Sequence, residues 1–335
     1  MQEAQFYNKL ENNIVRCQLC PKKCVIADGK RGDCKVRENQ DGVLYSLVYG
    51  KSCAVNVDPI EKKPLFHFLP GSESYSIGTV GCNLHCLFCQ NWTTAQQKPE
   101  SVINYDLSPK DVVRKATAEK CATIAYTYNE PIIFYEYVVD TAKIAKKKGI
   151  RSILVTNGYI NKEPALELTK YVDAANIDLK GFTEDYYKKV CFAELKPVLE
   201  TIKIFKDSGM WVELTNLIVP TLNDDFNKIR EMCRWIKDNL GNDVPLHFSR
   251  FYPMYKLENL PSTPVETLLK AKEIAVDLGL RYVYIGNIPT KEHENTHCHV
   301  CKKLLVKRLG FSVLENNIKQ GRCKFCSERI AGVWE

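Results

Sequence analysis

The spacing of the cysteines is the first sign of chemistry in this chain of 335 residues, which contains 15 of them. Most fall into three tight groups: the central cysteines (Cys82, Cys86 and Cys89), the N-terminal cysteines (Cys17, Cys20, Cys24 and Cys34) and the C-terminal cysteines (Cys298, Cys301, Cys323 and Cys326). Disulfide frameworks are typical of small secreted domains, whereas the first residues here have neither the basic nor the apolar segment of a secretory signal. Clustered thiols in a reducing compartment indicate metal binding or catalysis, so we expect a cytoplasmic protein.

The central cysteines follow the pattern CxxxCxxC, directly after a predicted strand. Three thiolates can hold three irons of a cubane cluster, which usually has four cysteine ligands. The fourth iron then keeps an open position, as catalytic metal sites do. Such an iron could bind the amino and carboxylate groups of S-adenosylmethionine, and an electron from the reduced 4Fe–4S cluster would break a C–S bond and leave a 5′-deoxyadenosyl radical. A zinc site completed by His85 or by a distant ligand is the alternative.

The two outer groups each offer four thiols. The C-terminal cysteines form two CxxC pairs, a spacing typical of ribbon-type tetrathiolate sites. Four ligands close the coordination shell, so we expect a structural metal there, with zinc (Zn²⁺) favoured over an iron or auxiliary iron–sulfur site. For the N-terminal cysteines, zinc and an auxiliary 4Fe–4S cluster are equally open, because thiolate suits both.

Short apolar runs alternate with helical stretches between residues 74 and 290. Strands are expected over 75–80, 123–126, 152–156, 174–178, 211–217, 246–249 and 282–285, and helices over 108–121 and 132–148. This alternation favours a parallel sheet, and its repeat number favours a full or partial (β/α) barrel. No Gly-x-Gly-x-x-Gly follows a strand, which disfavours a dinucleotide-binding fold. The predicted α/β organisation has a loop-rich, cysteine-rich metal-binding module over 1–45, a barrel domain over 46–290 and a zinc-ribbon-like module over 291–335.

Composition narrows the class of protein further. The chain is 45% hydrophobic and 26% charged, which excludes a disordered, collagen-like or coiled-coil protein. No apolar run reaches the length of a membrane-spanning helix. The net charge of +7 is compatible with anionic ligands but does not favour nucleic acid as a partner.

Several motifs in order along the chain carry a resemblance to a known family. Besides CxxxCxxC and the C-terminal cysteine pairs, they are CQLCPKKC at 17–24, GKRGDC at 29–34, DPIEKKPLFHF at 58–68 and YTYNEP at 126–131. The chain resembles the radical S-adenosylmethionine (radical SAM) superfamily, and within it the AmmeMemoRadiSam system enzymes, which are related to pyruvate formate-lyase activating enzymes. In the 58–68 segment, Lys62, Lys63 and His67 could bind an anionic substrate group or form a surface turn.

The resemblance also implies residues that contact S-adenosylmethionine, and none that is assigned as catalytic. Glu130 takes the place of a glutamate that holds the cofactor's amino group in the activating enzymes, with Asn129 and Tyr128 as weaker matches beside it. The others are Thr156 and Asn157 near the ribose, Asp178 and Lys180 as an Asp-x-Lys facing the cofactor, and His247 as a late-strand polar contact. Structural alternatives are a helix-start residue for Glu130, an ion pair for Asp178 and Lys180, and a core histidine for His247.

The function implied by the resemblance is reductive cleavage of S-adenosylmethionine followed by hydrogen abstraction from a substrate. That substrate could be a glycyl residue of a partner enzyme, a small metabolite or a side chain of another protein. A reductant such as flavodoxin or ferredoxin is implied, and AMMECR-type and Memo-type proteins are the implied partners. The alternative is a non-catalytic, zinc-rich module that binds protein or nucleic acid.

Overall fold

An eight-stranded sheet forms the centre of the computed structural model, which describes residues 1–288 and 292–335. In spatial order its strands are β16 (Val283–Gly286), β15 (Leu246–Arg250), β14 (Trp211–Ile218), β13 (Ala174–Asp178), β12 (Arg151–Thr156), β11 (Thr123–Tyr126), β9 (Glu73–Gly78) and β8 (Ala54–Pro59). All seven expected strands are confirmed, and neighbours from β9 to β16 pair in parallel. The eighth strand, β8, was not expected and pairs antiparallel with β9.

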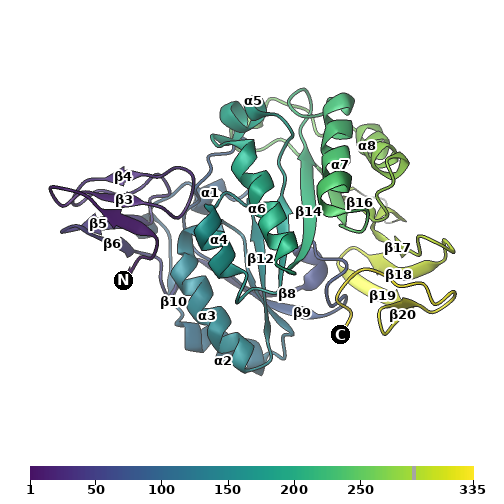
Figure 1. Cartoon of the computed structure of the whole chain (residues 1–335), viewed down its shortest axis with the longest axis horizontal. Coiled ribbons are helices and arrows are strands. Elements are labelled where there is room, and N and C mark those ends of the chain that lie inside the picture. The colour runs from purple at the N-terminus through teal and green to yellow at the C-terminus, as the bar shows by residue number, and fades with distance from the viewer. Residues whose placement is uncertain (289–291) are drawn as a thin grey trace.

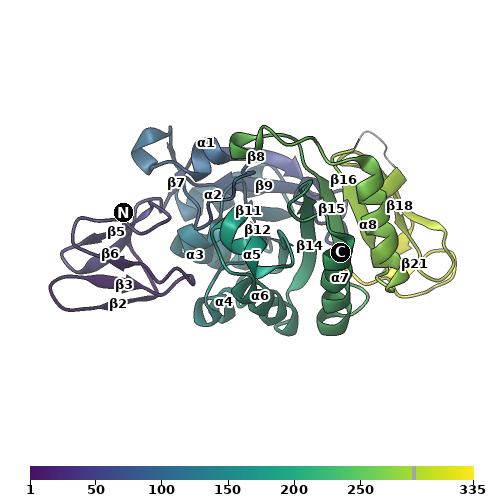
Figure 2. The same ribbon diagram turned by 90° about the horizontal axis from the view of Figure 1, so that it is seen from above.

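Helices connect these strands and lie along one side of the curved sheet, as α4, α6 and α7 do in Figure 2. They are α2 (Pro109–Ala118), α3 (Tyr135–Lys147), α4 (Lys162–Leu168), α5 (Glu184–Tyr186), α6 (Leu195–Asp207), α7 (Phe226–Leu240) and α8 (Val265–Asp277). Ser108 caps α2 by accepting a hydrogen bond from the Asp111 amide at 3.2 Å, and Pro109 takes the first helical position. The edge strands β8 and β16 do not pair in the described part of the chain, so the barrel is partial.

Short elements complete the connections. They are β7 (Lys51–Ser52), η1 (Ile60–Lys62), α1 (Trp92–Ala95), η2 (Pro99–Ser101), β10 (Tyr105–Asp106), η3 (Pro131–Phe134), the π-helical turn η4 (Tyr187–Cys191), η5 (Tyr255–Leu257) and η6 (Glu292–Glu294). The loop that carries the central cysteines runs from β9 to α1. No helix in the described ranges is long and apolar enough to cross a bilayer.

The N-terminal segment contains more regular structure than its sequence indicates. Two three-stranded sheets are formed by β1 (Gln2–Glu3), β2 (Tyr7–Lys9), β3 (Val15–Cys17), β4 (Val25–Ile26), β5 (Arg37–Gln40) and β6 (Val43–Ser46). These strands were not expected, because strands of two to four residues are too short to show an alternating pattern, and most of the segment still lies in loops. We propose this segment as a separate module, and the expected boundary at residue 45 falls inside β6.

The C-terminal segment lies at the opposite end of the molecule from the N-terminal one (Figure 1). It contains β17 (Thr296–His297), β18 (Leu304–Leu309), β19 (Ser312–Asn316), β20 (Ile318–Lys319) and β21 (Arg322–Cys323). Its apolar side chains pack with Phe66, Tyr282 and Tyr284 of the barrel. We propose it as a second module, whose expected boundary between residues 290 and 291 lies outside the described residues.

Gly81, directly before the central cysteines, fixes how closely the barrel and the N-terminal module approach. Its φ is +99°, and an added Cβ would lie 2.7 Å from Val36 Cγ1 and 2.8 Å from the Cys34 carbonyl oxygen. Gly209 has a similar φ of +82°, but in the described part of the chain no heavy atom other than those of Gly209 and its two chain neighbours lies within 4 Å of its Cβ position. We therefore expect Gly81→Ala to lower the free energy of unfolding by about 2–4 kcal/mol and Gly209→Ala by about 1 kcal/mol, measured by denaturant unfolding. Equal losses in the two variants would show that this contact is unimportant.

Candidate active site

A cavity of about 360 Å³ opens at the C-terminal ends of the parallel strands. The central cysteines line it, together with side chains from the last residues of β12 and β13 and from the segments that follow β11, β12 and β13. Those side chains include Asn129, Glu130, Thr156, Asn157, Asp178 and Lys180. The structure thus brings together every cofactor-site residue selected from the sequence except His247. Polar groups converge at this edge because the carboxyl ends of all the parallel strands meet there.

Backbone contacts shape the loop of the central cysteines. The amides of His85 and Leu87 donate to the carbonyls of Cys191 and Val190 at 3.1 and 3.0 Å, which ties the loop to η4. The Leu84 amide donates to Cys82 Sγ at 3.4 Å. The three thiols therefore face the cavity from a loop that is held by hydrogen bonds at several points.

The electrostatic environment differs among these three thiols. Burial raises the pKa of Cys89 to about 11 and raises that of Cys82 well above its usual value. The pKa of Cys86 is lowered, first by a hydrogen bond with the Cys191 thiol and also by the charge of Lys180. Cys86 is thus the central cysteine whose surroundings favour the thiolate, the form that binds metal.

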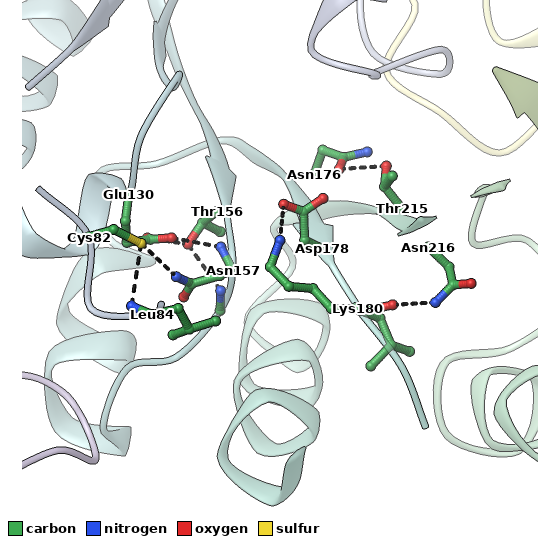
Figure 3. Close-up of polar contacts among 12 residues, drawn as sticks. Cys82, Leu84, Glu130, Thr156, Asn157, Asn176, Asp178, Lys180, Thr215 and Asn216 are labelled. Atoms are coloured by element: carbon green, nitrogen blue, oxygen red, sulfur yellow. Dashed lines mark hydrogen bonds and ion pairs between the residues drawn. The ribbon is translucent and has the colours of Figure 1, made fainter. Parts of the chain in front are cut away.

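Glu130 lies in the segment between β11 and η3 and is 2% exposed (Figure 3). Its Oε1 accepts hydrogen bonds from Thr156 Oγ1 at 2.6 Å and from the Ile132 amide at 3.0 Å. Its Oε2 accepts one from the Asn157 amide at 2.8 Å. A carboxylate oxygen has two lone pairs, so Oε2 can accept another bond from a cationic group in the cavity. Burial raises the pKa of Glu130 to about 7, although these hydrogen bonds oppose the shift.

Asn157 connects this carboxylate to the cysteine loop (Figure 3). Its Nδ2 lies 3.8 Å from Cys82 Sγ and donates to Asn83 Oδ1 at 2.9 Å. A second asparagine, Asn129, donates a hydrogen bond from its Nδ2 to the Thr79 carbonyl oxygen at 2.6 Å. The asparagines therefore hold the cavity wall by bonds to the backbone and to neighbouring side chains.

Asp178 and Lys180 form an ion pair at the end of β13, with Nζ 3.0 Å from Oδ2 (Figure 3). The Lys180 ammonium also lies 5.6 Å from the centre of the Phe88 ring, within the cysteine loop. Burial lowers the pKa of Lys180, but the negative charges of the Asp178 carboxylate and the Cys86 thiolate outweigh burial and raise it. The pair is therefore both a structural ion pair and part of the cavity wall, so the two readings of the sequence are compatible.

Other residues of the cavity wall were not predicted from the sequence as cofactor contacts. Lys62 and Lys63 line it, and both ammonium groups contact Asp58, at 2.8 and 2.6 Å. Burial opposes the shift, but bonds from both lysines and from Tyr128 lower the pKa of Asp58. Further wall residues come from within β14, from β15 and from the segment after β16: Thr215, Ser249 and Asn287. For Ser249 and Asn287, a place at or near a predicted strand end was the available signal.

His247 and His67 lie away from the cavity wall, in a buried network. His247 Nε2 is 2.7 Å from Glu213 Oε2, and neither histidine is among the described residues that line the cavity. His67 Nε2 is 2.6 Å from the Tyr284 hydroxyl. The structure therefore does not bring His247 to the other predicted cofactor contacts, because the Glu213 carboxylate on the neighbouring strand holds its ring.

The two outer cysteine groups differ in compactness. Cys298 Sγ lies 3.6 Å from Cys326 Sγ, and Cys301 Sγ lies 3.7 Å from Cys323 Sγ. Within residues 1–288 and 292–335, the C-terminal cysteines are the one group of three or more His, Cys, Asp or Glu side chains whose ligand atoms all lie within 4.8 Å of one another. The N-terminal cysteines line a small cavity of about 20 Å³.

The donor set around the large cavity fits an iron–sulfur cluster with one open iron. Three thiols face it, and no fourth cysteine is found among the described residues of its wall. Fe–S clusters use cysteine thiolates, and an open position is typical of a catalytic metal. A buried carboxylate with spare acceptor capacity, Glu130, faces the same space and suits a ligand ammonium group.

Comparisons with known proteins agree with this chemistry. Residues 76–236 match the Radical SAM superfamily. An uncharacterized protein of Methanocaldococcus jannaschii is 49% identical over 332 residues, covering 98% of this chain and 99% of its own. Pyruvate formate-lyase 1-activating enzyme of Escherichia coli is 23% identical over 219 residues, covering 61% of this chain and 89% of its own.

Solved structures show the same fold. A radical SAM methyltransferase from Sphaerobacter thermophilus superposes with a TM-score of 0.52 at 15% identity, covering 65% of this chain and 67% of that one. Three observations indicate the same superfamily: the parallel sheet, the position of the central cysteines after β9 and the sequence match over residues 76–236. Residues 76–236 form a Radical SAM superfamily domain, and the chain is similar to pyruvate formate-lyase activating enzymes.

Proposed function

We propose that this protein cleaves S-adenosylmethionine reductively and abstracts a hydrogen atom from a substrate in the large cavity. The observation that carries the proposal is the convergence of three thiols and one buried carboxylate on a single cavity at the carboxyl ends of the strands. The central cysteines would bind three irons of a 4Fe–4S cluster, and S-adenosylmethionine would bind the fourth. Bound there, the two groups supply an electron and a 5′-deoxyadenosyl radical.

The residues of the chain itself bind, orient and shield in this proposal. Glu130 accepts a hydrogen bond from the cofactor's amino group, and Thr156 and the Asn157 amide fix the carboxylate for it. The Asp178–Lys180 pair closes the wall beside Phe88. A walled cavity limits water around a reactive intermediate and so prevents side reactions.

We further propose that the protein belongs to the AmmeMemoRadiSam branch, with AMMECR-type and Memo-type proteins as its functional partners. The ordered motifs of the sequence support this placement. A glycyl residue of a partner enzyme is the first substrate class to test, by analogy with the activating enzymes. A flavodoxin or ferredoxin would supply the electron, and the free thiols suit the reducing cytoplasm.

One anaerobic experiment tests the proposed activity. Reconstituted protein is reduced with dithionite, electron paramagnetic resonance (EPR) spectra are recorded with and without S-adenosylmethionine, and 5′-deoxyadenosine is measured. We expect a cubane signal that changes when the cofactor is added, with 5′-deoxyadenosine formed. Protein that contains zinc only, with no cleavage after careful reconstitution, would instead support the non-catalytic binding module.

The compact C-terminal cysteines are proposed to hold one structural zinc ion. Thiolates around a tetrahedral zinc stand about 3.8 Å apart, since each Zn–S bond is about 2.3 Å long. The two Sγ pairs at 3.6 and 3.7 Å match this spacing. We expect Cys326→Ser to release one zinc per chain without loss of iron, measured by elemental analysis. Retained zinc together with lost iron would contradict the assignment.

A further inference from the structure

The N-terminal cysteines are too widely spaced to surround a single metal ion. Four thiolates on one zinc would stand about 3.8 Å apart. In the described part of the chain, no three of these four thiols have sulfur atoms all within 4.8 Å of one another, whereas the C-terminal four do. The central cysteines share the wider spacing. A cubane separates its thiolate ligands because each binds a different iron, so the N-terminal group resembles the central group rather than the zinc-type group.

All four N-terminal thiols nevertheless line one cavity, with Leu19, Ile26 and Ile133 as apolar neighbours. Nitrogen donors approach two of the sulfurs: Arg37 Nη1 lies 3.6 Å from Cys17 Sγ, and the Asp33 amide lies 3.4 Å from Cys24 Sγ. Apolar surroundings and N–H donors to sulfur are the features by which proteins tune the reduction potential of iron–sulfur clusters.

This cavity lies directly against the loop of the central cysteines. Asn83, the residue after Cys82, is part of its wall. The Asn83 side chain also accepts a hydrogen bond from Asn157 Nδ2, the atom that lies 3.8 Å from Cys82 Sγ. In addition, His85 Nε2 lies 2.9 Å from Asp33 Oδ2. One layer of side chains therefore connects the two cysteine groups.

We propose that the N-terminal cysteines hold an iron–sulfur cluster and that this cluster passes electrons to the cluster at the central cysteines. The inference rests on the proposed function, which supplies the electron acceptor. A one-electron carrier protein of the flavodoxin or ferredoxin class reduces the N-terminal cluster by one electron. That electron then moves to the oxidised central cluster, which gains the charge that the N-terminal cluster loses. No bond forms or breaks, and no proton is required.

The metal content of a triple variant tests the first half. Cys82→Ala, Cys86→Ala and Cys89→Ala together remove the central ligands and leave the N-terminal group intact. After anaerobic reconstitution we expect roughly four irons per chain and a reduced-cluster EPR signal, both of which disappear when Cys20→Ser is added. Cys121→Ala in the same background is the matched control, since Cys121 is buried outside the three groups, and it should keep the iron.

Two zinc ions and no iron in the triple variant would overturn the cluster assignment. This measurement does not depend on cleavage of S-adenosylmethionine, so its failure is distinct from failure of the proposed function. The metal content of the triple variant itself also does not require any N-terminal variant to fold.

The rate of reduction of the central cluster tests the second half. With the central cysteines intact, Cys20→Ser should slow reduction of the central cluster by flavodoxin at least tenfold but leave the EPR signal that the central cluster gives with dithionite in place. Equal flavodoxin rates with and without the N-terminal cluster would overturn the electron-transfer role.

Discussion

Replacing Cys86 by alanine is expected to abolish cleavage of S-adenosylmethionine. Cys86 is the central cysteine whose environment favours the thiolate, through the Cys191 thiol and the charge of Lys180. Loss of a partner outside the ligand shell typically costs 10- to 100-fold in metal affinity or activity, so loss of a ligand should cost more than about 100-fold. The measurement is 5′-deoxyadenosine formed per chain under dithionite, with iron content determined on the same sample.

Two controls separate this effect from general unfolding. The C-terminal module lies at the far end of the barrel and should keep its metal in Cys86→Ala. Cys121→Ala removes a buried thiol remote from the loop and should leave cleavage unchanged. Cleavage at an undiminished rate in Cys86→Ala would refute the role assigned to the central cysteines.

The parts of the fold that the sequence predicts are those with local signals. A strand such as β11 is a short, mostly apolar run that is buried throughout, because both faces of a parallel strand are covered. The central cysteines lie within eight positions of one another, so their spacing can be read without any tertiary contact. Glu130, Thr156 and Asp178 could be grouped in advance because strand ends meet at one edge of the sheet.

The parts that escaped prediction depend on contacts between distant residues. The Lys63–Asp58 pair reaches the cavity wall only because β8 joins the sheet antiparallel, and no local pattern marks that edge. His247 is the second residue of β15, near the amino end of that strand, whereas the cofactor-site residues lie at carboxyl ends, and its partner Glu213 is 34 positions away. Periodicity reports which side chains are buried, but it does not report which buried acceptor a histidine ring will face.

Glu130 is expected to make binding of S-adenosylmethionine dependent on pH. Burial raises its pKa to about 7, so the free protein holds a neutral carboxyl at pH 6 and a carboxylate at pH 7.5. Only the carboxylate form of Glu130 is a charged acceptor for a hydrogen bond from the ligand's amino group, so affinity should rise severalfold between these pH values. The ligand's amino group must also lose a proton before it can bind iron, which adds to the same rise. Isothermal titration of the reconstituted protein under anaerobic conditions measures this profile.

Two variants at the same carboxylate distinguish its charge from its packing. Glu130→Gln is permanently neutral, so affinity at pH 7.5 should fall about 10- to 100-fold, the value of a charge-assisted hydrogen bond, and the rise with pH should become shallower. Thr156→Val removes a hydrogen bond that lowers the pKa of Glu130 but keeps the charge, so it should move the rise to higher pH rather than abolish it. An equally steep rise in Glu130→Gln would mean that the charge of Glu130 does not contribute to the pH dependence. An unshifted rise in Thr156→Val would mean that this bond does not control the carboxylate.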